Sequence, residues 1–186
     1  MVNICYQNVE KLNFDKPSVI IANHQSFVDI LILLSLSPKI VMVTKGWVWK
    51  SPFFGRIIQY AGFYSIDEGY EKLVDSLSLF VDEGYSIVVF PEGTRSDDCE
   101  IKRFHKGAFY LAEKLQLEII PLVIYGTGLI SSKKQPFYIK KGDIIAKVIV
   151  NLKDLALMKD ATYQEKSKYY RKLFQYEYDI FKRQYN

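Results

Sequence analysis

The 186-residue sequence lacks the features that define several large classes of protein. Its two cysteines, Cys5 and Cys99, lie far apart and form no CxxC pair, which argues against a disulfide scaffold or a structural zinc site. The longest stretch without a charged residue, 119–132, is shorter than the ~20 apolar residues that span a bilayer. Charged residues also interrupt the N-terminus, so no signal peptide is visible. We therefore expect a cytoplasmic protein that is soluble or bound to a membrane surface.

Aromatic residues, in contrast, are abundant. The 14 Tyr, 12 Phe and 2 Trp make up 15% of the chain, and the formal net charge is +4. This composition suits an anionic partner and a surface that touches lipid or another apolar body. Nucleic acid is the competing anionic partner, and composition alone leaves that choice open. The basic residues are dispersed and no nucleic-acid-binding module is present, so we expect no nucleic acid partner.

Short apolar runs alternate with helical patterns along the chain, which is typical of a largely parallel sheet flanked by helices. The predicted buried strands are 18–22, 40–43, 86–90 and 119–125, and the predicted helices are 27–36, 53–61, 70–82 and 107–115. Residues 137–150 are predicted to form an edge hairpin that turns at 141–143, and 162–183 to form a C-terminal helix. The sequence therefore predicts one α/β domain over 1–186, with a motif-bearing core over about 17–150.

Polar residues follow three of the predicted strands. These clusters are 23–29, 44–46 and 90–96. Ligands of open α/β sheets bind beyond the carboxyl ends of the strands, so we expect the three clusters to meet on one rim.

The first cluster, Asn-His-Gln-Ser-Phe-Val-Asp, contains His24 and Asp29. If His24 lies on the turn and Ser26 caps the following helix, the two side chains can meet. A carboxylate bound to one imidazole nitrogen fixes the tautomer and lets the other nitrogen accept a proton from an alcohol. The alternative is a plain capping box with a loop histidine, and the spacing alone favours that alternative.

The cluster at 90–96, Phe-Pro-Glu-Gly-Thr-Arg-Ser, supplies Gly93 for a tight turn and Arg95 for phosphate binding. Alone it is equally compatible with a turn that carries a surface arginine. The chain has no G-x-S-x-G elbow, P-loop or G-x-G-x-x-G, and neither of its two histidines stands at a metal-ligand spacing. A base, a carboxylate and anion-binding cations, without metal or covalent nucleophile, fit acyl transfer from an activated thioester to a hydroxyl.

These motifs resemble the glycerolipid acyltransferases of the lysophosphatidic acid acyltransferase (1-acylglycerol-3-phosphate O-acyltransferase) type. The resemblance covers about 17–150 and consists of four blocks in family order. The first block is 23–29, which matches NHxSxxD, and the second runs from Lys45 through 52–55 to Gly62 and 65–67. The third is 90–96 followed by 104–108, and the fourth is 120–124 with Gly126. The first and third blocks together are highly specific, and they favour a catalytic role for His24 and Asp29.

The resemblance implies a role for individual residues. His24 is expected to act as general base and Asp29 as its orienting partner. The residues expected to bind the acceptor are Glu92, Gly93, Thr94, Arg95, Lys45 and Arg56, with Arg95 on its phosphate. Lys45 and Arg56 are also compatible with plain surface cations. The implied acceptor is a lysophospholipid such as lysophosphatidate, which gives phosphatidate. The implied donor is acyl-CoA or acyl-carrier protein, and no cofactor or metal is expected.

Two departures from the family pattern concern the acceptor. Glu68 stands where the family often has Arg, and His105 occupies the Lys position of the F-K-x-G pattern. Glu68 motivates a second hypothesis, the same chemistry on a non-phosphate lyso-aminolipid. A third hypothesis, a non-catalytic lipid-binding module, is disfavoured because both His24 and Asp29 are present.

Two segments are candidates for contact with a membrane. Residues 46–56 interleave Trp and Phe with Lys and Arg, a composition suited to the headgroup level, although these aromatics also suit a core. The C-terminal helix carries a stripe of aromatics at helical spacing, which we expect to dock on the sheet, and a basic side that can face anionic lipid. Family members commonly carry hydrophobic helices ahead of the first block, where this sequence has about 17 residues. This indicates either a peripheral enzyme or a domain cut from a longer chain.

Overall fold

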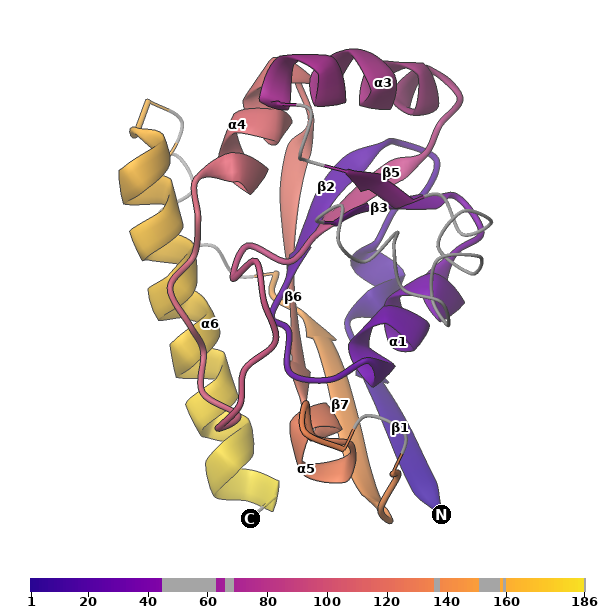
Figure 1. Cartoon of the computed structure of the whole chain (residues 1–186), viewed down its shortest axis with the longest axis vertical. Helices are drawn as coiled ribbons and strands as arrows, with labels where there is room; N and C mark the ends of the chain where they lie inside the picture. The colour runs from indigo at the N-terminus through magenta and orange to yellow at the C-terminus, as the bar shows by residue number, and fades with distance from the viewer. Residues whose placement is uncertain (45–62, 66–68, 136–137, 151–157, 159, 186) are drawn as a thin grey trace.

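Seven strands form one sheet in the computed structural model, which describes residues 1–44, 63–65, 69–135, 138–150, 158 and 160–185. The order across the sheet is β1-β7-β6-β2-β5-β3-β4 (Figure 1). Neighbouring strands are parallel, except that β6 and β7 are antiparallel. The strands are β1 Val2–Gln7, β2 Ser18–Ala22, β3 Ile40–Thr44, β4 Phe63–Ser65, β5 Ser86–Val89, β6 Glu118–Tyr125 and β7 Gly142–Val148.

Helices cover both faces of this sheet. One face packs against α3, α4 and α6, and the other against α1 and the short 3₁₀ helix η1 (Figure 1). The central strands are buried on both sides, which explains why β2 and β5 read as unbroken apolar runs. The helices are η1 Val9–Lys11, α1 Val28–Leu36, α3 Tyr70–Asp82, α4 Gly107–Lys114, α5 Thr127–Ile130 and α6 Tyr163–Tyr185.

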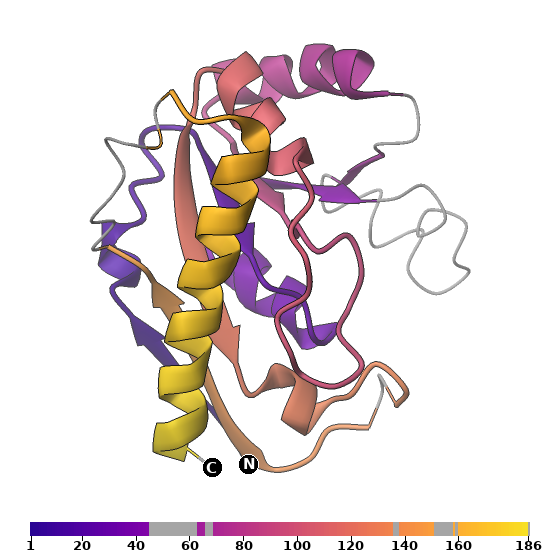
Figure 2. The same ribbon diagram turned by 90° about the vertical axis from the view of Figure 1, so that its left-hand side faces the viewer.

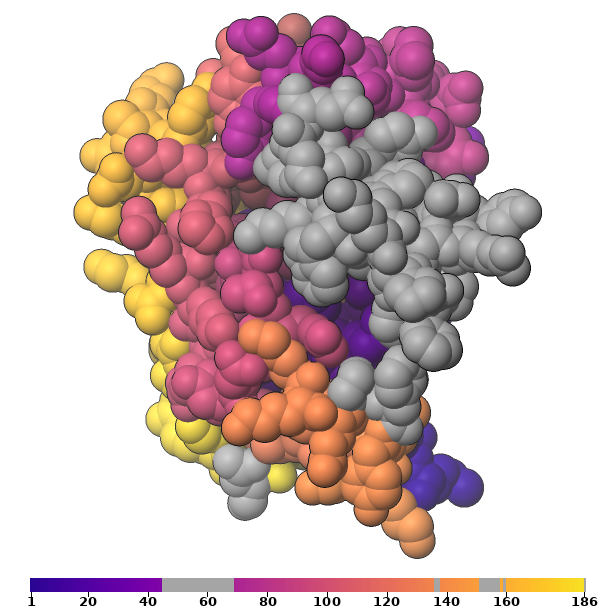
Figure 3. All heavy atoms as spheres, viewed as in Figure 1, coloured from indigo at the N-terminus to yellow at the C-terminus, as the bar shows by residue number. Residues whose placement is uncertain are grey.

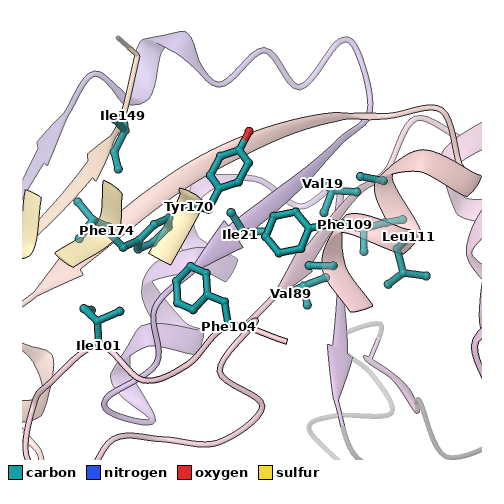
Figure 4. Packing of buried hydrophobic residues seen from close by; sticks show 14 of the residues in the cluster. Val19, Ile21, Val89, Ile101, Phe104, Phe109, Leu111, Ile149, Tyr170 and Phe174 are labelled. Atoms are coloured by element: carbon teal, nitrogen blue, oxygen red, sulfur yellow. The ribbon is translucent and has the colours of Figure 1, made fainter. Parts of the chain in front are cut away.

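The C-terminal helix α6 lies along one face of the sheet, beside β6 (Figure 2). The aromatic side chains of its inner stripe are buried, as the spacing predicted. The Phe174 ring packs edge-on against Phe104 at 5.1 Å between centroids, and Tyr170 stacks on Phe109 at 5.4 Å (Figure 4). Burial of these rings therefore attaches α6 to α4 and the loop before it.

Most of the predicted elements are confirmed within one or two residues of their expected ends. The prediction of an edge hairpin over 137–150 is wrong. Gly142 and Asp143 begin a single strand, β7, which lies between β1 and β6 rather than at the edge. The turn-like sequence at 141–143 is overridden because the strand that follows it pairs with β1 through 142–147 and with β6 through 145–148. The edge strand β1 was not predicted, and the predicted helix 53–61 lies outside the described residues.

Within the part of the chain that the structure describes, no helix combines the length and the apolar character needed to cross a membrane.

Candidate active site

Two loops meet at the carboxyl edge of the sheet, one after β2 and one after the adjacent parallel strand β5. The His24 backbone N–H donates to Glu92 Oε1 at 2.8 Å, and the Ser96 N–H donates to the His24 carbonyl at 2.8 Å. The clusters 23–29 and 90–96 therefore form one unit, as the sheet topology predicted.

His24 and Asp29 form a pair in this unit. The His24 Nδ1 lies 2.9 Å from Asp29 Oδ2, and the Asp29 side chain is fully buried. Asp29 Oδ2 also accepts hydrogen bonds from the backbone N–H groups of Gln25, at 2.7 Å, and Ser26, at 2.8 Å. Three donors on one oxygen fix the carboxylate, and the carboxylate in turn fixes the imidazole ring.

The start of α1 places Asp29 beneath the turn. Ser26 Oγ accepts a hydrogen bond from the Val28 N–H at 3.2 Å, while Asp29 reaches back to the Ser26 N–H. These reciprocal hydrogen bonds resemble a capping box that is displaced by one residue, because Phe27 and not Ser26 is the N-cap of α1. The capping and catalytic interpretations of the first motif are therefore compatible, because the same carboxylate serves the helix start and the histidine.

The imidazole of His24 lies against Phe90 and is mostly buried. Its ring stacks on Phe90 with centroids 3.9 Å apart and planes 14° apart, and 14% of its side chain is exposed. Donation of the Nδ1 proton to Asp29 leaves the lone pair on Nε2, which makes no hydrogen bond with any described residue. Figure 3 shows atoms of the N-terminal part of the chain at the bottom of a hollow near the middle of the molecule. A hydroxyl that reaches Nε2 meets a proton acceptor.

Two buried amide side chains attach the histidine loop, the loop after β2 that carries His24, to the rest of the fold. The Asn23 side chain donates to the Ile124 carbonyl and accepts from the Ile124 N–H, both at 2.8 Å, so it ties the end of β2 to β6. The Gln25 side chain donates to the Cys99 carbonyl at 2.9 Å and accepts from the Tyr178 hydroxyl at 3.0 Å. Tyr178 belongs to α6, so the C-terminal helix contacts the loop that carries His24 directly.

Glu92 holds the two loops together. It is buried, and its two carboxylate oxygens accept from the backbone N–H groups of His24 and Lys102, at 2.8 and 2.9 Å. Burial raises the pKa of Glu92 to about 7, and the nearby Asp29 adds to this rise, while the two backbone hydrogen bonds oppose it. Burial therefore outweighs the hydrogen bonds.

The rest of the 90–96 loop carries Arg95, which lies close enough to the His24–Asp29 pair to feel the charge of Asp29. Gly93 has φ +66°, a left-handed conformation that glycine adopts without strain, and its N–H closes a turn on the Phe90 carbonyl. The Arg95 carbonyl accepts from the Nζ atoms of Lys102 and Lys133, at 3.0 and 3.3 Å. Partial burial lowers the pKa of Arg95, while the charges of Asp29 and Asp97 oppose this shift. Its guanidinium forms no hydrogen bond or ion pair with the described residues, and Thr94 next to it is exposed.

A comparison with protein-family models decides the family. The model described as Acyltransferase matches residues 3–125, which is more than half of the chain. The chain belongs to the acyltransferase family.

Curated members of the acyltransferase family agree with this assignment. A 1-acyl-sn-glycerol-3-phosphate acyltransferase of Chlamydomonas reinhardtii is 33% identical over 134 residues, which are 70% of this chain and 40% of the relative. That of Saccharomyces cerevisiae is 33% identical over 153 residues, 78% of this chain and 50% of the relative. The chain thus spans about half the length of these relatives or less.

The fold is that of a solved acyltransferase. The crystal structure of the 1-acyl-sn-glycerophosphate (LPA) acyltransferase PlsC from Thermotoga maritima superimposes with a TM-score of 0.78. The two chains are 23% identical, and the match covers 97% of this chain and 73% of the other. The largely parallel sheet flanked by helices is therefore a shared architecture, and α6 lies beyond the part that the acyltransferase family model matches.

The structure brings together six of the eight residues that the sequence singled out for the acyltransferase site. His24 and Asp29, the latter at the start of α1, meet the 90–96 loop that carries Glu92 and the three residues after it, whereas Lys45 and Arg56 lie outside the described residues. Sequence reasoning missed the Gln25–Tyr178 contact, since a tyrosine on an apolar stripe predicts only core packing. Among the described residues, no group of three or more His, Cys, Asp and Glu side chains is placed to hold a metal ion.

Proposed function

We propose that the protein is an O-acyltransferase that moves a fatty acyl group from a thioester donor to the hydroxyl of a lysophospholipid such as lysophosphatidate. The observation that carries this proposal is the His24–Asp29 pair: the contact is 2.9 Å long, two backbone N–H groups also hold the carboxylate, and Nε2 is left to accept a proton. The chain's membership of the acyltransferase family supports the same chemistry.

The reaction needs one proton acceptor. His24 Nε2 takes the proton of the acceptor hydroxyl as its oxygen attacks the thioester carbonyl carbon. The tetrahedral intermediate then collapses, the carbon–sulfur bond breaks, and the imidazolium returns the proton to the departing thiolate. Asp29 keeps the imidazole in the tautomer that bears the Nε2 lone pair and stabilises the transient positive charge. The donor supplies the activated acyl group, so the proposed reaction requires no cofactor or metal.

Arg95 is the proposed ligand of the acceptor phosphate. Its guanidinium is half-buried near the His24–Asp29 pair, and two lysines hold its backbone carbonyl in place. Gly93 and Thr94 give this loop its turn and its exposed hydroxyl, and Glu92 fixes it to the histidine loop. Lys45 and Arg56 remain proposed acceptor contacts on the sequence resemblance alone.

A membrane surface is the proposed source of the acceptor. The Lys140 N–H donates to the Ile130 carbonyl at 2.9 Å, so the segment just before Lys140 runs beside the end of α5. The apolar side chains of Leu129, Tyr138 and Ile139, from these two segments, are exposed. Exposed apolar and aromatic side chains of this kind suit the headgroup level of a bilayer. A peripheral enzyme with this surface against lipid can take a lysophospholipid from the bilayer.

The proposal is tested by acyl transfer to lysophosphatidate in mixed micelles, with labelled long-chain acyl-CoA or acyl-carrier protein as donor. We expect transfer by the wild type and a loss of roughly 10³-fold or more in kcat for His24→Ala and for Asp29→Asn. The asparagine is nearly isosteric, but its amide favours the wrong imidazole tautomer.

Both variants are checked for native far-UV circular dichroism, so that unfolding is not read as lost chemistry. Turnover that survives in His24→Ala contradicts the assigned base. Transfer to a lyso-aminolipid but not to lysophosphatidate replaces the proposed acceptor. Lipid binding by a folded wild type that transfers no acyl group with either donor or acceptor favours a non-catalytic module.

A further inference from the structure

A second concave site lies where the first turns of α3 and α4 meet the first half of α6. It is a cavity of about 420 Å³, a volume within the range of small-molecule pockets. Its described lining contains none of the residues assigned above to the proposed acyl transfer. The cavity is therefore a candidate binding site in its own right.

The lining of this cavity is cationic. Its four basic residues come from two segments, Arg103 and Lys106 before the body of α4 and Lys168 and Arg171 on α6. The described lining includes no Asp or Glu. Three of the four cations are exposed and form no ion pair or side-chain hydrogen bond with another described residue; they are Arg103, Lys106 and Lys168. Several cations without a carboxylate among them favour a ligand that carries more than one negative charge.

Two carboxylates in neighbouring turns are engaged elsewhere. Glu113 accepts from the Tyr163 hydroxyl and lies 3.9 Å from the Lys166 Nζ. Glu165 accepts from the N–H and the hydroxyl of Thr162, at 2.8 and 2.7 Å, at the start of α6. Neither carboxylate lines the cavity, so the positive charge of the lining is left for a ligand.

Arg171 and the start of α4 supply donors that are fixed in place. The Arg171 guanidinium donates to the carbonyls of Ile101 and Lys102, both at 3.3 Å, and keeps further N–H groups for a ligand. Gly107, the first residue of α4, lines the cavity, and the N-cap residue Lys106 makes no side-chain capping hydrogen bond. The positive end of the α4 macrodipole therefore adds to the charge of the side chains.

Aromatic rings form another part of the lining. Tyr70 and Tyr110 meet edge to face with centroids 5.5 Å apart, and Tyr110 meets Tyr163 in the same way at 5.9 Å. The Tyr70 ring lies against Gly107, where any side chain would collide with it. These rings suit an anion that carries an organic group, because that group can be buried against them.

The cavity lies at the opposite end of the molecule from the exposed apolar side chains near α5. Figure 1 shows α3 and α4 at one end of the long axis and α5 at the other. A membrane that contacts Leu129, Tyr138 and Ile139 therefore leaves the cavity toward the solvent. This position favours a soluble ligand over a lipid headgroup.

We propose that this cavity binds a phosphate monoester, at a site separate from the acceptor-phosphate site proposed for Arg95. A phosphate monoester carries up to two negative charges and three terminal oxygens, which can accept from guanidinium, ammonium and backbone N–H groups together. The tyrosines contact the organic part of the ester. The same chemistry occurs in soluble phosphorylated molecules and in the headgroup of phosphatidate, and the test distinguishes these two sources. The inference does not depend on acyl transfer.

The test titrates the isotope-labelled protein with inorganic phosphate and with phenyl phosphate at low salt. Heteronuclear NMR follows the backbone N–H of Gly107, which lies in the cavity wall and locates the binding. We expect both probes to shift this signal. Phenyl phosphate should bind roughly 2- to 10-fold more tightly than inorganic phosphate, because its ring contacts the tyrosines.

A pair of charge-reversal variants shows whether the cations bind the phosphate. Arg103→Glu/Lys168→Glu should bind phenyl phosphate about tenfold more weakly or worse. Lys16→Glu/Lys172→Glu is the matched control, because it changes the net charge equally at two exposed lysines outside the lining, and it should bind within about twofold of the wild type. Arg95→Gln should also keep the affinity. Arg103→Gln/Lys168→Gln repeats the test if the reversed charges disturb the fold.

Vesicle flotation separates the two sources of the phosphate. Phosphatidylcholine vesicles with and without phosphatidate are compared for the wild type, the cavity double variant and its matched control. A Gly107 response to phenyl phosphate supports a soluble ligand. Flotation with phosphatidate that only the cavity variant loses, without that response, supports the headgroup.

Three results overturn the proposal. The first is equal affinity of the wild type and Arg103→Glu/Lys168→Glu for phenyl phosphate. The second is an equal loss in the matched control or in Arg95→Gln, which would assign the binding to net charge or to the acceptor site. The third is a Gly107 signal that responds to neither probe, together with equal flotation of all variants. None of these measurements needs turnover, so failure of the proposed acyl transfer is seen separately.

Discussion

The carboxyl edge of the sheet and the face beneath α6 are both buried, but they are held in different ways. At the edge, Asn23, Asp29 and Glu92 each bind backbone N–H groups through directed hydrogen bonds. Beneath α6, Phe104 and Phe174 are buried by contact between rings, without a hydrogen bond between their side chains. Hydrogen bonds depend on direction and protonation, whereas apolar packing depends on volume. Changes of chemistry should therefore matter most at the edge, and changes of volume beneath α6.

Phe174→Ala is expected to have the largest effect on stability. The ring is fully buried beneath α6, so its removal loses transfer free energy and leaves a cavity. We expect the free energy of unfolding to fall by about 3–5 kcal/mol, measured by urea denaturation. Tyr176→Ala is the control on the same helix, because Tyr176 is exposed and should change stability by under about 0.5 kcal/mol. Equal losses in the two variants would show that the apolar face does not hold α6.

Glu92→Gln tests the polar edge through pH. Burial raises the pKa of Glu92 to about 7 from an ordinary value of 4.5. Between these pH values the folded protein holds a proton that the unfolded chain has released. The Glu92 contribution to stability is therefore greatest below about pH 4.5, falls as the pH rises, and is lost above about pH 7. The glutamine does not titrate, so the stability of wild type relative to Glu92→Gln should fall by about 2–3 kcal/mol between pH 5 and pH 8.

This prediction is checked by urea unfolding at pH 5, 6.5 and 8. The glutamine amide cannot accept from both backbone N–H groups, so a constant loss of about 1–3 kcal/mol at every pH is expected in addition. Glu83→Gln, which removes an exposed carboxylate at the end of α3, is the control. Parallel pH profiles of wild type and Glu92→Gln would contradict the raised pKa.

The sequence predicted the centre of the fold better than its margin. The strands β2 and β5 are buried on both faces, so their apolar runs carry a strong local signal. The strand β1 was not predicted and β7 was predicted as part of a hairpin, because these two strands pair through residues about 140 positions apart. A turn-like Lys-Gly-Asp sequence does not reveal that a distant strand will extend through it.

The same contrast applies to the proposed site. His24 and Asp29 lie five residues apart and meet through one turn, so their pairing could be predicted from a motif. The Glu92 bond to the His24 N–H follows from adjacent parallel strands, but its double backbone contact does not. The contact of Tyr178 with Gln25 spans 153 positions and depends on where α6 docks, so periodicity could predict only that Tyr178 is buried.

Tyr178→Phe acts where the two regions meet, and its expected effect is the smallest. The variant keeps the buried ring but removes the hydroxyl that donates to Gln25, whose own backbone N–H donates to Asp29. We expect a loss of about 1 kcal/mol in stability and a kcat that falls roughly 3- to 10-fold, with little change in KM.

Tyr170→Phe is the matched control, because Tyr170 is a buried tyrosine of α6 whose hydroxyl forms no hydrogen bond with a described residue. A double-mutant cycle with Gln25→Leu separates positioning from packing. If the hydroxyl acts through Gln25, Tyr178→Phe should lower kcat no further once the amide is gone. Additive losses would mean that Tyr178 only packs, and that the helix beyond the family's matched region stabilises the fold without ordering the loop that carries His24.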